Sequence, residues 1–386
     1  MKNVLIASTH NSRGLSGEYP ALFKRANLTT TVIAHPKYKP YGGRDVSHWI
    51  DSSDNPDLVI IQIAKLVSDN PKAFDWIILG DDNLVRAIAT SSISDELKAR
   101  IGPLGNSNYF KLMEGKCGAS QTLSSLGFNV APFRVCERVA DIQQAIAEIG
   151  LPAIVKPDHS LGSEGVTICR TQDDVAACVK KCREGAHIVE KFIVGKQVRI
   201  DPLFFNGQLV ACNASLMLGM MHGDLGVSTA RGVVSALPYV EFLKKLGATL
   251  NLHGMMNIGV LHEDNGKEFH IFEMDCRPNG YANQIKRFDN DFAQAILAYQ
   301  QPDFDVHNFL SPDNNKLARN FERDVLYNIR KGNIKALLAW VINEDNRWDC
   351  LPLHDPRLLF FTFWLVIKDL AQRALNKLGK LLGFKR

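Results

Sequence analysis

The order of apolar and polar segments predicts alternating strands and helices over the first hundred residues. The segments 4–7, 29–34 and 75–80, the last with WIIL in its middle, are typical of buried strands, and helical patterns lie between them, one of them over 56–67. Strands that alternate with helices in this way usually pair in parallel, with the helices packed on the sheet. We therefore expect residues 1–108 to form a Rossmann-like α/β lobe.

The middle of the chain contains a strand that ends in a single cation. AIVKP at 153–157 is an apolar run that stops at Lys156 and a proline. The loop that follows, SLGSEG at 160–165, consists mostly of small residues, so its backbone N–H groups can turn toward an anionic oxygen. A solvated hairpin is the alternative interpretation of the loop taken alone, and the neighbouring lysine favours anion binding.

A second apolar strand of this region ends in a carboxylate near an aromatic ring. HIVE at 187–190 is followed by Lys191 and Phe192, after a helical pattern over 172–183. A purine requires an apolar slot for its faces and a few fixed polar groups for its edge. The pattern therefore favours a nucleotide base near Glu190.

Two carboxylates on one predicted strand indicate a cation site. In the segment 269–275, FHIFEMD, Glu273 and Asp275 are two positions apart and project to the same face of a strand. Two carboxylates on one face repel each other unless a cation lies between them, and Mg²⁺ prefers oxygen ligands. An exposed acidic strand edge is the alternative interpretation.

In this order, the segments resemble the ATP-grasp superfamily, whose members bind ATP between two α+β lobes and mostly join a carboxylate to an amine or a thiol. The resemblance is carried by IVKP, LGSEGV, VEKFIVGKQVRID and FHIFEMDCRPNG, and it covers roughly residues 116–280. It implies an α/β and α+β architecture. An ATP-grasp domain is expected over 109–300, with ATP between the segment 128–195 and the sheet 197–280, behind the Rossmann-like N-terminal lobe.

The resemblance also implies a reaction and a set of site residues. The expected function is a ligase that uses ATP and Mg²⁺ to activate a small carboxylic acid as an acyl phosphate and transfers it to an amine. The implied residues are Lys116, Lys156, Ser160, Gly162, Ser163 and Gly165 for the phosphates, Glu190 and the backbone near Ile193 for adenine, Gln197 for ribose, Glu273 and Asp275 for magnesium, and Arg277 and Arg231 for the acid or acyl phosphate. For Arg231 a surface salt bridge is an equal alternative, since guanidinium groups bind any carboxylate well.

Three positions depart from the family pattern. Gln197 stands where the family has a ribose-binding acid, and an amide binds hydroxyls more weakly than a carboxylate does. Asp275 replaces an asparagine, which preserves oxygen ligation and adds negative charge. Gly259 falls where the family places a further metal ligand, and Asn257 or Glu263 would supply that ligand after a shift in register.

Two segments of the N-terminal lobe follow predicted strands. Arg13, Gly14 and Gly17 are candidates for a phosphate loop, but GxGxxG is absent, and we prefer a lobe that helps to bind the substrate. Residues 80–83, GDDN, lie at the strand end where open sheets place ligands, and a helix N-cap is the equal alternative.

Two further segments flank the nucleotide residues. Lys116 lies in a helix predicted over 109–126, in which Lys111 competes for the same role. Residues 200–214 predict a hairpin with an Asn-Gly turn, and 216–226, rich in Met and Gly, is expected to form a mobile flap over the active site.

The composition is that of a globular protein. A hydrophobic content of 46% over 386 residues is ample for two or three packed units. The eight cysteines contain no CxxC pair, which indicates a reducing cytoplasm and no structural zinc, and the N-terminus lacks the apolar region of a signal peptide. Residues 356–386 carry a charge of +6 in a chain of net charge +4, so the remainder, at −2, argues against nucleic acid as a partner.

The C-terminal part has no family motif and ends in a basic tail. Residues 301–355 are expected to form a helical extension, and 356–386 a basic amphipathic helix. The apolar block 358–367 is too short to span a bilayer alone. Together with Trp364 and the local charge it favours peripheral contact with anionic lipid on the inner face of the membrane. Packing on the protein itself or a homodimer contact is the equal alternative.

Two other functions stay open. A nucleotide-binding module without catalysis is favoured by the missing acid at Gly259, and a dinucleotide-binding oxidoreductase by the N-terminal alternation of strands and helices. A thermal-shift comparison of MgATP with NAD(P) distinguishes the ATP-grasp fold from the dinucleotide-binding oxidoreductase, because a bound ligand stabilises the folded protein.

Overall fold

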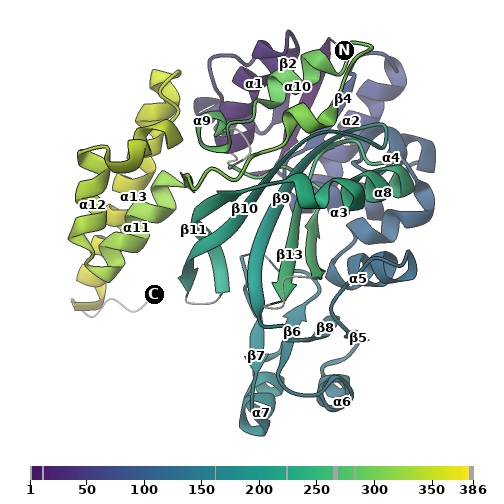
Figure 1. Cartoon of the computed structure of the whole chain (residues 1–386), viewed down its shortest axis with the longest axis vertical. Helices are drawn as coiled ribbons and strands as arrows, with labels where there is room; N and C mark the ends of the chain where they lie inside the picture. The colour runs from purple at the N-terminus through teal and green to yellow at the C-terminus, as the bar shows by residue number, and fades with distance from the viewer. Residues whose placement is uncertain are drawn as a thin grey trace.

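The structure is a computed structural model. In the part of the chain that it describes, three sheets follow one another along the sequence (Figure 1). The residues outside the description are 1, 11–12, 161, 223–224, 264–267, 282–283 and 382–386. The N-terminal sheet and the large sheet share one region of the molecule, the small sheet extends away from them, and three C-terminal helices stand beside the large sheet (Figure 1).

The N-terminal lobe is built on a parallel sheet, as its pattern of segments predicts. Its strands lie in the order β3-β2-β1-β4, and each neighbouring pair is parallel. They are β1 (Asn3–Ser8), β2 (Thr29–Ala34), β3 (His48–Asp51) and β4 (Trp76–Leu79). The helices of the lobe are α1 (Tyr19–Arg25), α2 (Pro56–Asp69), α3 (Asp82–Thr90) and α4 (Asp95–Ile101). The Rossmann-like lobe is therefore confirmed, and of its described strands the pattern missed β3, whose side chains are exposed or half-buried.

The small sheet buries one face and turns the other toward the large sheet. Its antiparallel strands, in the order β5-β8-β6-β7, are β5 (Phe133–Cys136), β6 (Ala153–Pro157), β7 (Thr167–Cys169) and β8 (His187–Lys191). Helices α6 (Ile142–Ile149) and α7 (Gln172–Lys181) cover one face, where Val155 and Val189 lie in a core of their own. Because side chains alternate along a strand, Lys156 and Glu190 project from the opposite face.

The large sheet is antiparallel and carries the longest strands. Its order is β14-β13-β9-β10-β11-β15, and β12 pairs with β9. The strands are β9 (Gly195–Phe205), β10 (Gln208–His222), β11 (Leu225–Val234), β12 (Gly254–Met255), β13 (Asn257–Glu263), β14 (Phe269–Asp275) and β15 (Leu317–Arg319). The predicted hairpin is confirmed as β9 and β10, and α8 (Val240–Leu250) packs on the sheet in a core that continues into the N-terminal lobe.

The helix predicted over 109–126 is interrupted. The structure has a 3₁₀ segment, η3 (Ser107–Met113), followed by α5 (Lys116–Ser125). At the junction a Cβ atom on Gly115 would lie 2.5 Å from the Asp158 Oδ1, and the same carboxylate accepts a hydrogen bond of 2.7 Å from the Cys117 N–H. The contact with Asp158 therefore starts a new helix, and Lys116 is its first residue.

The described residues of the segment 216–226 are strands that line the first cavity, and the mobility expected of this segment stays a prediction. These residues complete the β10–β11 hairpin, whose pairing shifts register in this stretch. A Cβ atom on Gly219 would lie 2.5 Å from the Thr229 Oγ1, so this glycine permits close strand packing. Residues 223–224 of the predicted flap lie outside the description.

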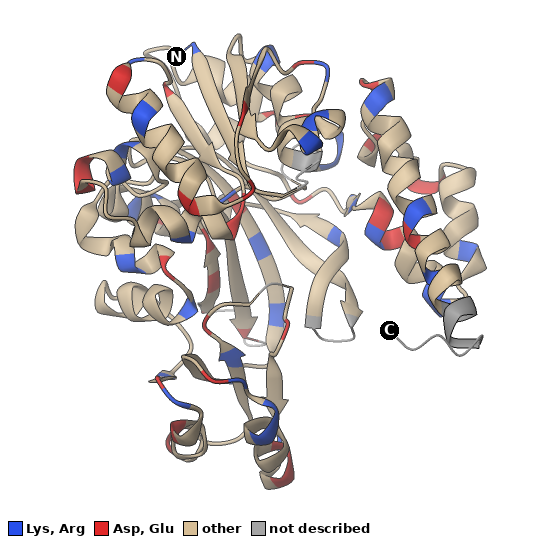
Figure 2. Ribbon diagram, turned by 180° about the vertical axis from the view of Figure 1, so that it is seen from behind, with Lys and Arg blue, Asp and Glu red and all other residues tan. Residues whose placement is uncertain are grey.

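The C-terminal helices form a unit beside the large sheet. After α9 (Ile285–Phe288), α10 (Phe292–Ala298) and β15 come α11 (Phe321–Lys331), α12 (Ile334–Val341) and α13 (Pro356–Leu381), and we call these last three the helical unit. Figure 2 shows basic and acidic residues distributed over it. Since β15 pairs with β11, the helical unit begins directly at the edge of the large sheet.

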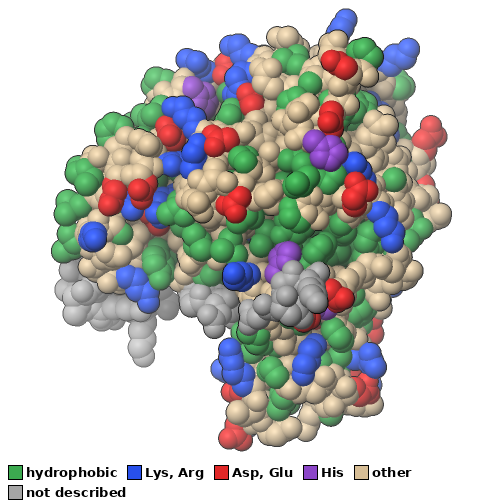
Figure 3. All heavy atoms as spheres, in the orientation of Figure 1, with side chains coloured by type: hydrophobic (Ala, Val, Ile, Leu, Met, Phe, Trp, Pro, Cys, Tyr) green, Lys and Arg blue, Asp and Glu red, His purple; other side chains and the backbone are tan. Residues whose placement is uncertain are grey.

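Helix α13 has one buried and one exposed apolar stripe. Leu358 and Val366 are buried, which makes the packing alternative correct for their side of the helix. The exposed stripe, 43–62% accessible, consists of Phe360, Phe363, Trp364 and Ile367. Hydrophobic side chains are accordingly visible on the surface of the helical unit (Figure 3). Among the described residues, no helix combines the length and apolar character needed to cross a bilayer.

Candidate active site

A cavity of about 680 Å³, the first cavity, lies between the small sheet and the large sheet. Of the residues predicted to bind ATP, its wall includes Lys116, Lys156, Ser160, Gly162, Ser163, Glu190, Ile193 and Gln197. Apolar parts of the wall come from Ile154, Ile168, Phe192, Leu216 and Leu261. An apolar slot with a few polar groups is the environment that a purine base requires.

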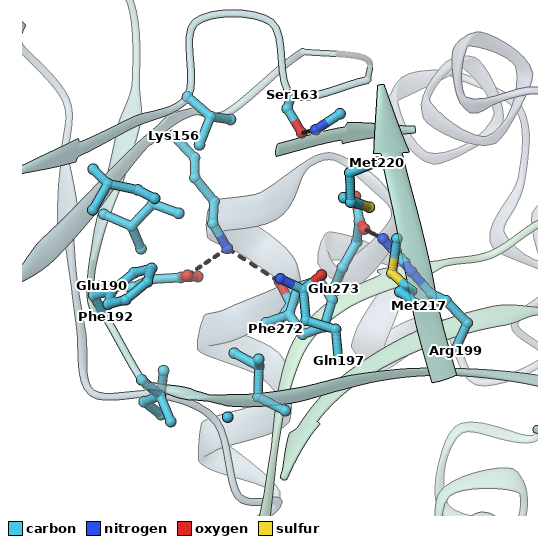
Figure 4. A pocket seen from close by; sticks show the side chains of 18 of the residues that line it. Lys156, Ser163, Glu190, Phe192, Gln197, Arg199, Met217, Met220, Phe272 and Glu273 are labelled. Carbon is cyan, nitrogen blue, oxygen red and sulfur yellow. Dashed lines mark hydrogen bonds and ion pairs between the residues drawn. The ribbon is translucent and has the colours of Figure 1, made fainter. Parts of the chain in front are cut away.

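The two buried charges of the small sheet pair with each other (Figure 4). Lys156 Nζ lies 2.5 Å from the Glu190 Oε2 and donates a hydrogen bond of 3.3 Å to the Phe272 carbonyl oxygen. The two side chains are only 10% and 6% exposed. Lys156 therefore joins the small sheet to β14 across the first cavity, and Glu190 lies in that cavity with its charge balanced.

Lys116 reaches the glycine-containing loop from the start of α5. Its Nζ donates to the Ser160 carbonyl oxygen at 3.0 Å and to the Ser160 Oγ at 3.2 Å. Its competitor Lys111 is exposed and is not part of the cavity wall. Of the two lysines, Lys116 is thus the one positioned to reach a ligand beside the loop.

Among the described residues of the loop between β6 and β7, three have a left-handed backbone, Gly162, Ser163 and Gly165. The Ser163 Oγ accepts a hydrogen bond of 3.0 Å from the Gly226 N–H, which brings the loop onto β11. Gly165 does not line the first cavity, and a Cβ there would lie 2.7 Å from the Pro157 Cγ. Gly165 therefore allows the loop to close on β6, a different role from the phosphate contact expected of it.

An arginine that the sequence reasoning missed lies beside Glu273. In the large sheet, Glu273 pairs with Gly259 and Gly259 with Arg199. Since Gly259 has no side chain, the Arg199 guanidinium extends over it and lies 2.5 Å from the Glu273 Oε2 (Figure 4). Burial acts to raise the pKa of Glu273, but Arg199, together with Lys156 and Lys116, holds that pKa below its usual range.

Asp275 belongs to a second group of charges. Burial, and after it the charge of Glu273, raise the pKa of Asp275 above its usual range. Arg277 Nη2 lies 3.5 Å from Asp275 and binds Asp82 of α3 through Nε at 2.6 Å and Nη2 at 2.8 Å. Arg277 thereby links β14 to the N-terminal lobe.

The carboxylates fit magnesium only together with a ligand. In the described part of the chain, no group of three or more His, Cys, Asp or Glu residues is arranged to hold a metal ion. Glu273 and Asp275 form an open pair, and Mg²⁺ often takes one or two carboxylates with the rest from phosphates and water. The proposed substitutes for Gly259 are engaged elsewhere, because Asn257 donates to Asp201 at 2.6 Å and Glu263 lies 2.7 Å from His270.

A second cavity, of about 760 Å³, adjoins the first. Its wall includes Arg231, Arg277, Asp275 and Glu273, so the predicted acid-binding and metal-binding residues meet here. Arg231 is 5% exposed, which excludes the surface salt bridge. The residues shared by both cavities are Gly162, Ser163, Arg199, Met217, Gly226 and Glu273.

The N-terminal lobe contributes to the second cavity through the residues after β4. Asp81 is the N-cap of α3 and accepts from the Leu84 N–H at 3.1 Å, and Gly80, Asp81, Asp82 and Asn83 all line the cavity. The N-cap and the position at a ligand cavity therefore occur together. Gly17 packs closely on α13, since a Cβ atom there would lie 2.8 Å from the Leu358 Cδ2. The side chains of Arg13 and Gly14 lie outside the description.

Comparisons of sequence place these features among known proteins. Residues 121–197 match the sequence model of the ATP-grasp domain. A stretch of 80 residues, 20% of this chain and 25% of the relative, is 38% identical to D-alanine–D-alanine ligase of Acinetobacter baumannii. Another of 116 residues, 28% of this chain and 30% of the relative, is 28% identical to the formate-dependent phosphoribosylglycinamide formyltransferase of Actinobacillus pleuropneumoniae. The chain therefore spans only about a quarter to a third of the length of these relatives.

Solved structures resemble nearly the whole chain. An N5-carboxyaminoimidazole ribonucleotide synthetase in complex with ADP matches 86% of this chain and 85% of its own, with a TM-score of 0.61 at 16% identity. An L-amino acid ligase from Bacillus licheniformis matches 80% of this chain and 76% of its own, with a TM-score of 0.55 at 14% identity. Such identities show the fold alone. The chain thus has the ATP-grasp fold, and residues 121–197 match the ATP-grasp domain in sequence.

Proposed function

We propose that this protein is an ATP-dependent ligase that joins a small carboxylic acid to an amine through an acyl phosphate. The observation that carries the proposal is the junction of the two cavities, where Arg199, Glu273 and Ser163 line both. A nucleotide in the first cavity and an acid in the second would meet at this junction, which is the geometry that phosphoryl transfer between them requires.

The first cavity would hold ATP by its polar wall. Glu190 and the backbone near Ile193 would bind the edge of adenine in the apolar slot, and Gln197 the ribose. The phosphates would lie against the loop residues Ser160, Gly162 and Ser163, with Lys116 and Lys156 beside them. An incoming phosphate would then compete with Ser160 for Lys116 and with Glu190 for Lys156.

The reaction would proceed in two substitutions. An oxygen of the acid forms a bond to the γ-phosphorus while the bond to ADP breaks. The amine nitrogen then attacks the acyl carbon, inorganic phosphate leaves, and the nitrogen loses a proton. Stabilisation of charge on the phosphoryl oxygens dominates catalysis of this kind. Arg199 would provide it at the junction, and Arg277, held in place by Asp82, would contact the acid or the acyl phosphate.

Magnesium would be bound by Glu273 and Asp275 together with phosphates of the nucleotide, and it would neutralise part of their charge. The chain's own residues prepare this place. Arg199 keeps Glu273 ionised, and Arg277 partly balances Asp275. Gly259 provides no metal ligand, and the guanidinium of its neighbour Arg199 provides positive charge at that place instead.

The deciding experiment is ADP release from MgATP with pooled amino acids and small carboxylic acids. Release that depends on both an acid and an amine supports the ligase. Tight binding of MgATP without ADP release in any pool would support the non-catalytic module instead, for which the glycine at 259 is the specific observation.

We also propose that α13 binds a membrane surface with anionic lipid. The exposed stripe contains Trp364 and two phenylalanines, and exposed basic residues such as Arg357 and Lys368 lie on the same helix. Amphipathic helices with this composition lie in the lipid headgroup region. The protein would then work in the cytoplasm at the inner face of the membrane, and a second copy of the chain is the competing occupant of the stripe.

A further inference from the structure

Helix α11 forms part of the wall of both cavities. Tyr327 lines the first cavity and Arg323 lines the second, and the two residues are four positions apart, which puts them on one face of the helix. Asn320 and Glu322, at the start of α11, also line the second cavity. The helical unit is therefore in direct contact with the candidate site.

Arg231 enters the second cavity from β11 with an incomplete set of partners. Its Nε donates to the Ser228 Oγ at 3.0 Å, and its guanidinium lies 4.0 Å from the centre of the Tyr281 ring. Its buried Nη1 has no hydrogen-bond partner among the described residues, and the nearest Asp201 oxygen is 3.7 Å away. A guanidinium that is 5% exposed and lacks an acceptor is arranged to receive one from a ligand.

Arg323 approaches the same cavity from the third position of α11. It is half-buried, and no ion pair of its side chain is present among the described residues. The N-terminus of α11 adds partial positive charge, since the Asn320 side chain caps only one of its first N–H groups, that of Arg323 at 3.0 Å. Burial lowers the pKa of Arg231, Asp201 opposes this, and the charges of Arg199 and Arg323 lower it further.

The carboxylates of the second cavity are engaged with other groups. Asp82 binds Arg277, Glu273 binds Arg199, and Asp81 accepts from backbone N–H groups. Glu18 and Glu322 also have interactions of their own. Apart from the distant Asp201, 3.7 Å from Arg231, two guanidinium groups are thus held toward one cavity without a carboxylate in hydrogen-bond contact, an arrangement that an anionic ligand would stabilise.

We infer that Arg231 and Arg323 bind an anionic group of the acid substrate, a carboxylate or a phosphate. This inference rests on the proposed ligase function. The carboxylate to be activated has to lie at the junction beside Arg199, whereas Arg231 and Arg323 line only the second cavity. The substrate therefore carries a second anionic group, and the helical unit selects for it.

Calorimetric titration of the full chain, saturated with MgADP, tests the inference with succinate, phosphonoacetate and acetate as probes. The dianions succinate or phosphonoacetate should bind at least tenfold more tightly than acetate. Tighter binding of succinate would indicate a site for a carboxylate, and tighter binding of phosphonoacetate a site for a phosphate group. Arg323→Gln should reduce the affinity for the dianion about tenfold, to the level of acetate. Arg330→Gln, an exposed arginine of the same helix, is the matched control and should leave all affinities unchanged.

Two results would overturn the inference: equal affinity for acetate and the dianions, or dianion binding that Arg323→Gln leaves intact. Affinity for MgADP is measured in the same variants and should not change. If the protein binds no MgADP at all, the proposed ligase function fails, and the dianion titration without nucleotide still tests the two arginines.

Discussion

Arg199 and Glu273 form an ion pair, 2.5 Å from Nη2 to Oε2, over a glycine of the strand between them. A Cβ atom on Gly259 would lie 3.0 Å from the Arg199 Nη1 and 2.5 Å from the Phe272 Cζ. The absence of a side chain at Gly259 is therefore what allows the pair. Gly259 thus supplies no metal ligand, which is a departure from the family pattern, and it leaves space for the guanidinium of Arg199.

The Arg199–Glu273 pair should show strong coupling in stability. Arg199→Met leaves Glu273 without its main partner, and we expect the free energy of unfolding to fall by roughly 3 kcal/mol. The double variant Arg199→Met, Glu273→Met should recover part of this loss, since no charge is then left unpaired. Urea denaturation of the four proteins gives the coupling free energy. Additive losses would show that the pair has no energetic role.

Loss of the Glu273 carboxylate should affect catalysis more than folding. Glu273→Gln preserves the size of the side chain and removes a proposed magnesium ligand, so we expect the turnover of MgATP to fall by roughly a hundredfold or more. Glu268→Gln, an exposed residue just before β14, is the matched control. Turnover of Glu273→Gln within a few fold of the wild type would remove Glu273 from the proposed metal site.

Two glycines with the same φ of +73° should differ in their tolerance of a side chain. Gly165→Ala adds a Cβ 2.7 Å from the Pro157 Cγ, whereas Gly127→Ala adds one with no atom within 4 Å. Strain in the backbone alone costs about 1 kcal/mol, so Gly127→Ala should lose about that much. Gly165→Ala should lose more and should also weaken ATP binding, measured by calorimetry. Equal effects of the two substitutions would contradict the packing of the loop on β6.

His253 should make the protein less stable in mild acid. It lies among aromatic rings, with its ring centre 5.0 Å from that of Phe205, and burial lowers its pKa to about 4. Between about pH 6.5 and 4 the unfolded chain binds a proton that the folded chain does not, so stability falls as the pH falls. From pH 7 to 5 the expected loss is about 2 kcal/mol. Denaturation at both pH values should show a smaller loss for His253→Asn, with the exposed His48→Asn as control.

The exposed stripe of α13 should decide whether the protein binds lipid. Flotation with vesicles of anionic lipid should carry the full chain upward, and Phe360→Gln with Trp364→Gln should abolish this, since both side chains are exposed. Leu338→Gln, on the exposed side of α12, is the control. Equal flotation of all three proteins would exclude the exposed stripe as the lipid contact. A wild type that stays at the bottom and sediments as a dimer would exclude the membrane.

Elements with a strong local pattern were predictable to the residue. The strands Thr29–Ala34 and Ala153–Pro157 begin and end at the residues predicted, because a buried strand is recognisable from its own side chains. The break at Gly115 and the strands in 216–226 were not predictable in this way. They depend on contacts with residues distant in sequence, such as Asp158.

The site was predictable for its local segments and not for its cross-strand partners. Glu273 and Gly259 were expected to lie near each other, and they do pair. Arg199 was missed because its role depends on the register of three strands. The available signal was the alternation on β9, which places Arg199 on the same face as Gln197, two positions before it. Arg323 was missed since nothing in α11 itself indicates that the helix borders a cavity.

The separate core of the small sheet has a consequence for its contact with the large sheet. Val155 and Val189 belong to an apolar cluster that is distinct from the one shared by the N-terminal lobe and the large sheet. The contacts that cross the first cavity include polar ones, from Ser163 to the Gly226 N–H and from Lys156 to the Phe272 carbonyl. Polar contacts exchange with water at a small net change in free energy, whereas opening an apolar core is far more unfavourable. Separation of the small sheet from the large sheet would thus break polar contacts and leave the apolar core of each intact.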